Sequence, residues 1–363
     1  MSRSSGAQIL VVGAGIIGRS IAYYLCRAGA HPTLIEASAG PSEASRASLG
    51  VLTHFSGGAS TYALFIRDSH AAHEPLAGEL ADETGIDVGW RPLGGIDLVI
   101  DDEDEERVEG LWNEGRARGV VLERLDADSV HKMEPVVSGA VRWGLLFPED
   151  QRVAPMLLGQ ALLEGAVSRG AHVHYDERLL HIEACADGGI VAQTSRARRH
   201  ADFVVLAAGA WTARLAESIG ASVPVRPVRG QHGCFAGPAL RHVLRQGGHQ
   251  LLSGARGTLV GATAEEVGFV NETTQEAARA LGSVHAQLLK GPSVLRSQGA
   301  GLRAKPKAGR PMIGPLSDHP RVFIATGHYK NGVLMGPLTG QVVTRWLLTG
   351  DPGRDMEPFV PER

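Results

Sequence analysis

The sequence is short of cysteine, lacks any long hydrophobic run and carries little net charge. Its 363 residues include three widely spaced cysteines, Cys26, Cys185 and Cys234, which form no C-x-x-C pair. Neither a disulfide framework nor a thiolate metal site is indicated, and a reducing compartment fits this usage. No apolar run reaches the ~18 residues that a membrane-spanning helix needs. We therefore expect a cytoplasmic protein without a membrane span.

The charged residues and histidines exclude two further classes of ligand. The formal net charge is −3 and no long run of lysine or arginine occurs, so a nucleic-acid partner is not indicated. The 15 histidines form no HExxH pair, and we expect no protein-bound metal. The acidic run 101–106 is interpreted as a helix start or a solvated loop. The length predicts two domains, because single cores stop growing near ~250–300 residues.

What the sequence does contain is a glycine motif directly after its first apolar run. Residues 8–12 are predicted to form a strand, in which residues 9–12 are apolar without alternation, as in a parallel strand that is buried on both faces. Gly13, Gly15 and Gly18 follow, and helical spacing begins there instead of a signal-peptide pattern. The first glycine permits the turn, the second lets backbone approach a pyrophosphate, and the third lets the helix pack on the strand. The helix N-terminus would attract the phosphates.

A carboxylate completes this motif. A second strand, predicted over 32–35, ends at Glu36, at the spacing from Gly18 that is typical of a ribose-binding acid. Such a carboxylate accepts hydrogen bonds from a ribose diol and repels a 2′-phosphate, which disfavours NADP. The strand–turn–helix–strand context predicts a dinucleotide site. It does not choose between FAD and NAD, because both carry the same ADP half.

The rest of the chain alternates between sheet and helix. Small residues dominate 37–50 and would let backbone lie close to a large ligand, with a flexible loop as the alternative. A buried strand at 203–209 ends in Ala208 and Gly209, which again permit close approach of a cofactor. Further predictions are helices over 62–84, 105–118, 156–169, 275–289 and 333–348, and strands at 94–100, 171–175, 256–263 and 321–327, the strand at 171–175 returning to the first sheet.

Six segments carry a resemblance that spans nearly the whole chain. They are VVGAGIIGRSIAYYL, EASRASLGVL, VVLAAGAW, PVRG, GLRAKPKAGRPMIG and VFIATGHYKNGVLMGPLTG. The chain resembles the D-amino-acid oxidase superfamily of FAD proteins, and most closely its glycine oxidase (ThiO-like) branch. The resemblance implies an α/β fold with a discontinuous Rossmann-like FAD-binding domain (1–85, 150–222 and 300–363). It also implies an α+β substrate-binding domain on an antiparallel sheet (86–149 and 223–299).

The resemblance also implies which residues touch FAD. The ADP half is expected beside Ile16, Ile17, Glu36 and Ala37, with adenine at the backbone of Leu179. The ribityl chain and the flavin are expected beside Ala44, Ser45, Leu49, Gly50 and Val51. The pyrimidine side of the flavin is expected at the closing turn and helix start, His328, Tyr329, Lys330, Asn331, Gly332, Val333 and Leu334. A helix N-terminus there would stabilise the negative charge of reduced flavin.

FAD is expected to be bound without a covalent link. Monomeric sarcosine oxidases carry a cysteine shortly after the segment that matches GLR, whereas residues 305–307 here are Lys-Pro-Lys. Relatives whose flavin is attached covalently to a histidine carry that histidine just before the glycine that matches Gly50. Here Ser48 and Leu49 occupy those positions.

The resemblance places the substrate beside Arg303, whose planar guanidinium suits bidentate binding of a carboxylate. A surface salt bridge is the alternative role for this arginine. A tyrosine that the family uses beside the carboxylate is absent, and His249 falls nearest its position, either as a substitute donor or as an ordinary loop histidine. Lys330 stands where glycine oxidases often carry arginine, and Ala308 replaces a common aspartate, so the pocket is altered.

The activity implied is oxidation of glycine, sarcosine or a D-amino acid by hydride transfer to flavin N5. The products are an imine and, with oxygen as acceptor, hydrogen peroxide. The first alternative is a dehydrogenase of the same fold that passes electrons to a quinone or carrier. A non-catalytic flavin-binding subunit and a purely NAD-dependent enzyme are further alternatives. The expected partners are a small amino acid or amine, oxygen or an electron carrier, and a second copy of the chain if it forms a homo-oligomer.

Overall fold

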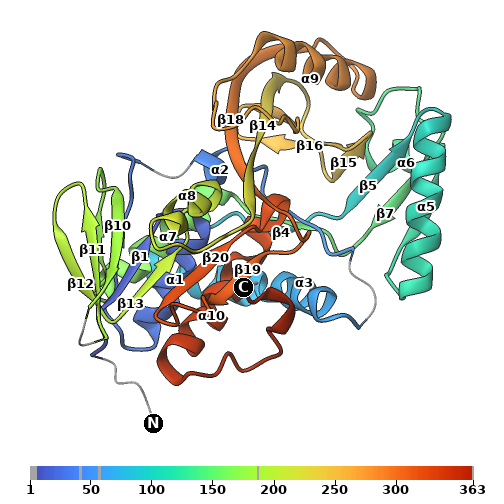
Figure 1. Cartoon of the computed structure of the whole chain (residues 1–363). Helices are drawn as coiled ribbons and strands as arrows, with labels where there is room; N and C mark the ends of the chain where they lie inside the picture. Colours follow the sequence, from blue (N-terminus) through green and yellow to red (C-terminus); the bar gives the residue numbers. More distant parts are fainter. Residues whose placement is uncertain (1–5, 41–42, 56–58, 186–187, 362–363) are drawn as a thin grey trace.

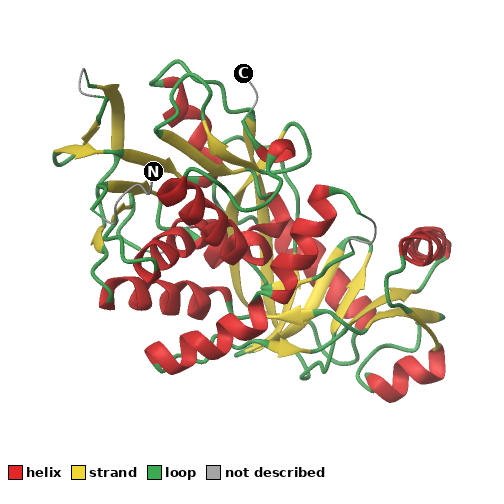
Figure 2. Ribbon diagram, turned by 90° about the horizontal axis from the view of Figure 1, so that it is seen from below, coloured by secondary structure: helices red, strands yellow, loops and turns green. Residues whose placement is uncertain are grey.

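The computed structural model describes residues 6–40, 43–55, 59–185 and 188–361. Two large β-sheets occupy different parts of the molecule, and most of the helices gather around the first (Figures 1 and 2). Two long strands of the second sheet reach back towards the first, beside the elements at the end of the chain (Figure 1). This arrangement brings both sheets to one site.

The first sheet is the predicted parallel sheet. Its strands are β1 (Ile9–Val12), β2 (Thr33–Ile35), β9 (His172–His174), β13 (Phe203–Leu206), β19 (Met312–Pro315) and β20 (Val322–Thr326). The order is β19-β20-β13-β1-β2-β9, and all neighbours are parallel except the edge pair β19 and β20. The prediction that the strand at 171–175 returns to this sheet is confirmed, because β9 pairs with β2.

The two faces of the first sheet are covered by different layers. One face carries α1 (Ile16–Arg27), α7 (Pro155–Ser168) and α10 (Gly332–Thr349). The other carries a three-stranded sheet of β10 (Leu179–Ala184), β11 (Ile190–Thr194) and β12 (Arg198–Ala201), together with α8 (Thr212–Glu217). Along β1, Val11 packs into the first core, and Leu10 and Val12 pack into the second. Both faces are therefore buried, as the unbroken apolar run predicts.

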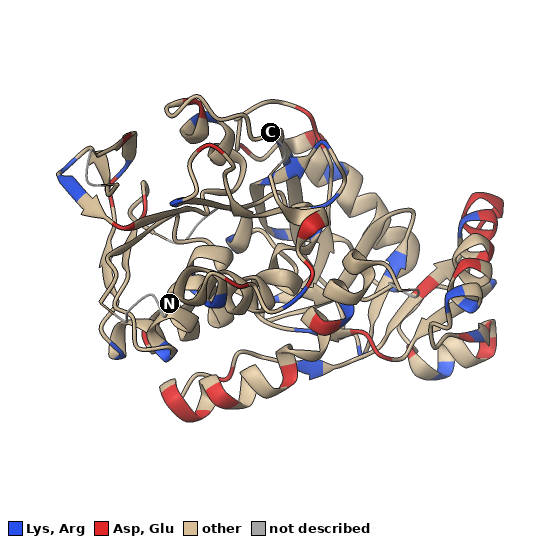
Figure 3. Cartoon of the chain, turned by 60° about the horizontal axis from the view of Figure 1, so that its bottom comes forward, with Lys and Arg blue, Asp and Glu red and all other residues tan. Residues whose placement is uncertain are grey.

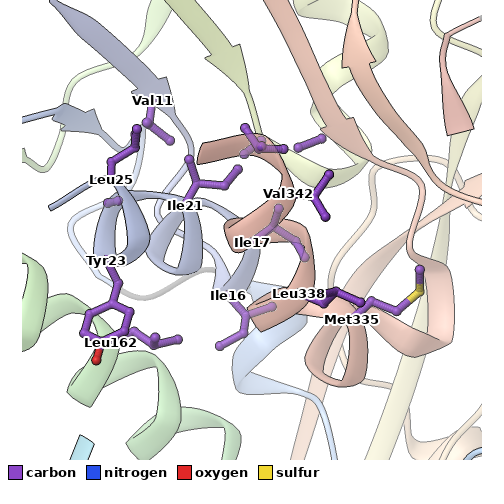
Figure 4. Close-up of a cluster of buried hydrophobic side chains, with 14 of the residues drawn as sticks. Val11, Ile16, Ile17, Ile21, Tyr23, Leu25, Leu162, Met335, Leu338 and Val342 are labelled. Atoms are coloured by element: carbon purple, nitrogen blue, oxygen red, sulfur yellow. The ribbon is translucent and has the colours of Figure 1, made fainter. Parts of the chain in front are cut away.

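Helices α1 and α10 cross closely because α10 presents glycine to its neighbour. A Cβ on Gly340 would lie 2.7 Å from the backbone of Ser20, and one on Gly336 would lie 3.4 Å from Ile16. Beside this crossing, Ile17 of α1 lies against Leu338 of α10 (Figure 4). Each helix follows a parallel strand of one sheet, so both begin at the same edge of that sheet.

The second sheet has eight strands and is antiparallel with one exception. Its strands are β5 (Gly95–Val99), β6 (Glu123–Asp126), β7 (Trp143–Phe147), β14 (Val225–Ala236), β15 (Val243–Gln246), β16 (His249–Gly254), β17 (Gly257–Gly261) and β18 (Val294–Pro306). The order is β18-β14-β17-β16-β15-β5-β7-β6, and only β15 and β5 run parallel. Strand β18 pairs with β14 across the predicted boundary at residue 300. We keep the two-domain division as a proposal.

The faces of this second sheet have distinct neighbours. Helix α9 (Gln275–Leu288) packs on one face against Leu251 and Val260. The opposite face carries Val243 and Leu252, which contact Leu49 from the small-residue loop after the first sheet. We call this the inner face, because it meets the part of the chain that comes from the first sheet.

The acidic run is the start of helix α5 (Asp102–Arg118), which confirms one of the two interpretations above. The side chain of Asp101 caps the helix by accepting a hydrogen bond from the Asp104 N–H at 2.9 Å. Acidic residues in the first turn and Arg116 and Arg118 in the last complement the helix dipole. Both signs of charge are interleaved along α5, at the right of Figure 3.

The single helix predicted over 62–84 is wrong. It is two helices, α3 (Thr61–Ala71) and α4 (His73–Thr84), that meet at Ala72. The cause is Pro75, which has no N–H to donate and whose ring clashes with a carbonyl one turn earlier, so it is tolerated only in a first helical turn. The remaining elements are α2 (Glu43–Arg46), α6 (Ala127–Met133), the three-residue turns η1 (Gly209–Trp211), η2 (Tyr329–Asn331) and η3 (Glu357–Phe359), and a small sheet of β3 (Val51–Leu52), β8 (Gln151–Arg152) and β4 (Arg91–Pro92).

Candidate functional site

A cavity of about 630 Å³ lies at the carboxyl ends of β1, β2, β13 and β20. This edge of a parallel sheet is where ligands of such folds bind. Of the residues singled out from the sequence, fifteen line the cavity: Gly13, Gly15, Ile16, Ile17, Glu36, Ala37, Ala44, Ser45, Leu179, Ala208, Gly209, Arg303, His328, Tyr329 and Gly332. They come from both sheets, because Arg303 belongs to β18.

The glycine loop has the geometry that close approach of a phosphate group requires. Gly13 has a φ of +104°, and a Cβ there would lie 2.7 Å from the Ala207 carbonyl oxygen. A Cβ on Gly18 would lie 1.9 Å from the Gly13 oxygen, so Gly18 lets α1 pack against the loop without lining the cavity. Gly15 is the N-cap of α1 and places no side chain over the first N–H groups. The loop therefore fits a pyrophosphate.

Glu36 lies beside this loop, as its spacing predicts. One carboxylate oxygen accepts a hydrogen bond from the Ala14 N–H at 2.8 Å, and the other accepts one from the Ser38 N–H at 3.0 Å. These bonds hold the carboxylate at the cavity wall, next to Ala37 and across from Leu179 of β10. A ribose diol placed there would find an oriented acceptor.

The small-residue loop divides into a part that faces the cavity and a part that does not. Ala44 and Ser45 line the cavity, and the Ser45 hydroxyl accepts a hydrogen bond from the Ile16 N–H at 3.1 Å. Gly50 has a φ of +77°, and a Cβ there would lie 2.1 Å from the Val153 oxygen. Leu49 packs on the second sheet and Val51 pairs with Arg152 of β8. These last three residues do not line the cavity; they lead into β3 of the small sheet.

The closing turn places a helix N-terminus at the cavity. Gly327 has a φ of +80° and Tyr329 one of +49°, a strained conformation for a residue other than glycine. The His328 ring points back into the protein and contacts the Thr339 hydroxyl at 3.1 Å, and burial lowers its pKa to about 3. Helix α10 then begins at Gly332, which lines the cavity.

The residues around the start of α10 serve the helix rather than the cavity wall. The Asn331 side chain does not cap α10 and instead donates a hydrogen bond to the Tyr62 hydroxyl at 3.4 Å. Val333 and Leu334 are buried in the core of the first sheet. The Leu334 carbonyl contacts the buried His73 ring at 3.0 Å, which ties α10 to α4. The first N–H groups of α10 therefore lack a side-chain cap.

Arg303 reaches the cavity from the inner face of the second sheet. One guanidinium nitrogen donates a hydrogen bond to the Thr263 carbonyl at 2.9 Å. A Cβ on Gly230 would lie 2.3 Å from the guanidinium carbon, so glycine on the neighbouring strand makes room for this side chain. Burial lowers the pKa of Arg303, and Tyr329 opposes that effect. Among the described residues, no carboxylate lies within 4 Å of the guanidinium.

His249, the predicted substitute for the family tyrosine, is not brought to Arg303. Alternation along the paired strands relates Arg303, Val228, His232, Gly261 and Gln250 to one face, the inner face. The residue before Gln250 in the chain is His249, so alternation places it on the opposite face. It does not line the cavity. Gln250 and His232 lie on the inner face and are therefore better candidates for the hydrogen-bond donor that replaces the tyrosine.

His232 is a candidate that the sequence did not single out. It lies on the inner face between Arg303 and the backbone of Ala47. Burial lowers the pKa of its imidazole, and the positive charge of Arg303 lowers it further. Its Nδ1 is buried without a hydrogen-bond partner among the described residues. Alternation within the segment PVRGQHG, in which Gly230 and His232 share a face, is the signal that could have found it.

An aromatic and cationic group at the mouth was also missed. Trp211 and Arg214 line the cavity, and the Trp211 ring lies 4.2 Å from the Phe269 ring. The Arg214 guanidinium lies 3.9 Å from the Phe269 centroid, within the range of a cation–π contact. Phe269 comes from the loop between β17 and α9, and nothing in its sequence spacing indicates this contact.

A parallel sheet with a glycine-lined cavity at its carboxyl edge, joined to a second sheet that supplies an arginine, defines a dinucleotide-binding oxidoreductase. Comparison with known proteins gives the family. The family model of FAD dependent oxidoreductases (DAO) matches residues 8–346, and the chain belongs to this family. It is an FAD-dependent oxidoreductase similar to glycine oxidase. The family implies FAD as the cofactor, and the cavity residues fit its ADP half.

The similarity covers almost the whole chain. Glycine oxidase of Bacillus licheniformis is 30% identical over 98% of this chain and 96% of its own length. The crystal structure of glycine oxidase from Geobacillus kaustophilus matches with a TM-score of 0.92 at 27% identity, over 98% of this chain and 99% of that one. Hydrogen cyanide synthase subunit HcnC of Pseudomonas aeruginosa is 27% identical over 98% of this chain and 96% of its own length.

Two features are absent from the part of the chain that the structure describes. None of its helices is both long and apolar enough to cross a membrane. No group of three or more His, Cys, Asp or Glu side chains is arranged to hold a metal ion.

Proposed function

We propose that this protein oxidises the carbon–nitrogen bond of a small amino acid or amine, with non-covalently bound FAD. Arg303 carries the proposal. It lines the cavity, burial disfavours its charge, and no described carboxylate neutralises it. A partly buried cation without an anion costs free energy, which a substrate carboxylate would offset. Relatives named glycine oxidase over the full length support an amino-acid substrate.

Each part of the cavity then has a role. The glycine loop and Glu36 hold the ADP half, while Ala44, Ser45 and the start of α10 lie along the rest of the cofactor. When bound, FAD supplies the acceptor for the hydride that leaves the substrate carbon. Arg303 binds the carboxylate and so fixes the reacting carbon. A neutral amine that loses hydride needs no general base, and the imine of an amino acid hydrolyses to an oxo acid and ammonia, or to an oxo acid and a primary amine where the substrate is a secondary amine.

An anaerobic absorbance experiment tests this proposal. The purified protein should be yellow, and glycine, sarcosine or a D-amino acid should bleach its flavin band. Arg303→Ala should abolish the bleaching while the flavin content stays unchanged, because this arginine touches substrate and not the nucleotide. Arg226→Ala, on the same sheet but paired with Glu266 at 2.6 Å, is the matched control. A native holoprotein whose flavin no amino acid or amine can bleach would overturn the proposal.

A subunit role is the second candidate, favoured by the similarity to a hydrogen cyanide synthase subunit. In that case electrons leave the reduced flavin for a carrier rather than for oxygen, as in a dehydrogenase. Mixing the reduced protein with air in a stopped-flow instrument separates the two. Fast reoxidation with release of hydrogen peroxide supports an oxidase. Slow reoxidation that a quinone accelerates supports a dehydrogenase or a subunit.

A further inference from the structure

Positive charge gathers where the cavity meets the second sheet. Lys305 and Lys330 each place the ammonium nitrogen 5.7 Å from the centroid of the Tyr329 ring. Tyr329 lines the cavity beside Arg303, and the two side chains are close enough to interact electrostatically. We call Arg303, Lys305 and Lys330 the Tyr329 cation cluster.

The described carboxylates leave this cluster poorly neutralised. No carboxylate oxygen lies within 4 Å of Arg303 or Lys330 in the described residues. Lys305 has one partner, Glu266, at 3.7 Å, and this exposed carboxylate makes its closer contact with Arg226 at 2.6 Å. Loss of solvent lowers the pKa of Lys330, and the charges of Arg303 and Lys305 lower it further. Like charges held together in this way favour an anion between them.

A single substrate carboxylate would not bind all three cations of the cluster. Arg303 and Lys305 lie two residues apart on β18 and therefore share a face, with their Cα atoms about 6.6 Å apart. Lys330 follows Tyr329 in the closing turn, on a different segment of the chain from Arg303 and Lys305. A bidentate guanidinium satisfies one carboxylate on its own. The two ammonium groups are then left for a second anionic group on the same molecule.

We propose that the substrate is a dicarboxylate, an amino acid or secondary amine in which Arg303 binds one carboxylate and Lys330, with Lys305, binds the other. This inference rests on the proposed function, because it names the substrate class of the same site. It follows from the position of three cations around Tyr329, of which Arg303 lines the cavity, whereas Lys305 and the exposed Lys330 lie outside its lining. Iminodiacetate and D-aspartate are suitable members of the class, and glycine lacks the second anion.

Binding of unreactive acids tests the inference without turnover. We would titrate the holoenzyme with malonate and with acetate at constant ionic strength and follow the flavin absorbance spectrum. Malonate should bind roughly tenfold more tightly than acetate, the worth of one charge-assisted hydrogen bond. Lys330→Met and Lys305→Met should each remove most of that preference and leave acetate binding nearly unchanged. Lys307→Met, an exposed lysine on the same segment, is the matched control.

Each outcome decides between the two proposals. Equal affinities for malonate and acetate in the native holoenzyme would overturn the dicarboxylate inference, and bleaching by glycine would still support amine oxidation. Malonate preference that survives both lysine substitutions would also overturn it. Malonate preference without bleaching by iminodiacetate, D-aspartate or glycine would support the binding site and contradict the proposed function. An unchanged acetate affinity in each variant shows that the flavin site is intact.

Discussion

The walls at the two ends of the cavity consist of different chemical groups. At the nucleotide end the wall is backbone: the glycines at 13 and 15 and the first N–H groups of α1, with Gly18 packed behind them. At the substrate end it is side chain, a guanidinium from one sheet beside a tyrosine from the closing turn. At the nucleotide end, the absence of side chains leaves room for the ligand. At the substrate end, the fold must hold a side chain in the correct position.

This difference decides how each end responds to change. A backbone wall has no spare volume, because a Cβ on either Gly13 or Gly18 would lie within 2.7 Å of another backbone oxygen. Backbone cannot move aside without disturbing the sheet that carries it. A side-chain wall can shift by changing rotamers, so substitutions there should alter rate and specificity while FAD stays bound.

The largest expected effect is directly behind the backbone wall, at Gly18. Gly18→Ala should abolish retention of FAD and lower the free energy of unfolding by about 1–3 kcal/mol, because the new Cβ would overlap the Gly13 oxygen. Flavin content after purification and thermal unfolding measure both. Gly78→Ala, in α4 with nothing within 4 Å of its Cβ position, should leave both nearly unchanged. Full FAD content in Gly18→Ala would contradict the proposed difference between the nucleotide end and the substrate end.

A Cβ at the substrate end should act differently. Gly230→Ala would place a methyl group 2.3 Å from the Arg303 guanidinium carbon and force that side chain to move. We expect kcat/KM to fall roughly 100-fold, as for a catalytic group misplaced by about 1 Å. FAD content should stay full. Gly110→Ala, on the open surface of α5, is the control. Loss of FAD together with activity would show that the two ends are not independent.

The contrast also explains what could be predicted from the sequence. Gly13, Gly18 and Glu36 lie within one strand–helix–strand unit, so their spacing alone fixes their geometry. His249 depends on the hairpin of β16 and β17, where Gly254 pairs with Gly257 across a two-residue turn. A shift of one residue in such a register moves every side chain to the other face. Sequence position alone therefore does not determine which face of the sheet His249 occupies.

The small-residue loop shows a second reason why the sequence predicted the site only in part. Its composition predicts close approach of backbone, and this is what Gly50 does, but towards the Val153 oxygen rather than towards the cavity. A glycine in the sequence indicates that another part of the protein or a ligand packs closely there, but it does not indicate which. In the helix predicted over 62–84, by contrast, Pro75 was a readable signal for the break at Ala72.

Acid should act on the closing turn and on α4, which each contain a buried histidine. Burial lowers the pKa of His328 to about 3 and that of His73 to about 4, so each ring is neutral in the folded protein and must lose that burial to gain a proton. Their stabilising contribution is complete above pH 6.5 and is lost as the pH falls towards 4, by about 2–3 kcal/mol per ring at pH 4.5.

Thermal unfolding from pH 7 to 4.5 measures this loss. His328→Gln should flatten the dependence of Tm on pH, because glutamine has no proton to gain. His31→Gln, at an exposed histidine, should leave the dependence unchanged. A steep dependence that survives in both His328→Gln and His73→Gln would show that these rings do not carry it.

The smallest effect separates the two histidines near the substrate end. His232 lies on the inner face beside Arg303, whereas alternation places His249 on the opposite face. His232→Ala should lower kcat/KM about threefold to tenfold by removing the polar ring beside Arg303, with FAD content unchanged. His249→Ala should leave kcat/KM as it is. The reverse pattern would mean that the register of the β16–β17 hairpin differs in solution, and that the missing tyrosine is replaced at its own position in the sequence.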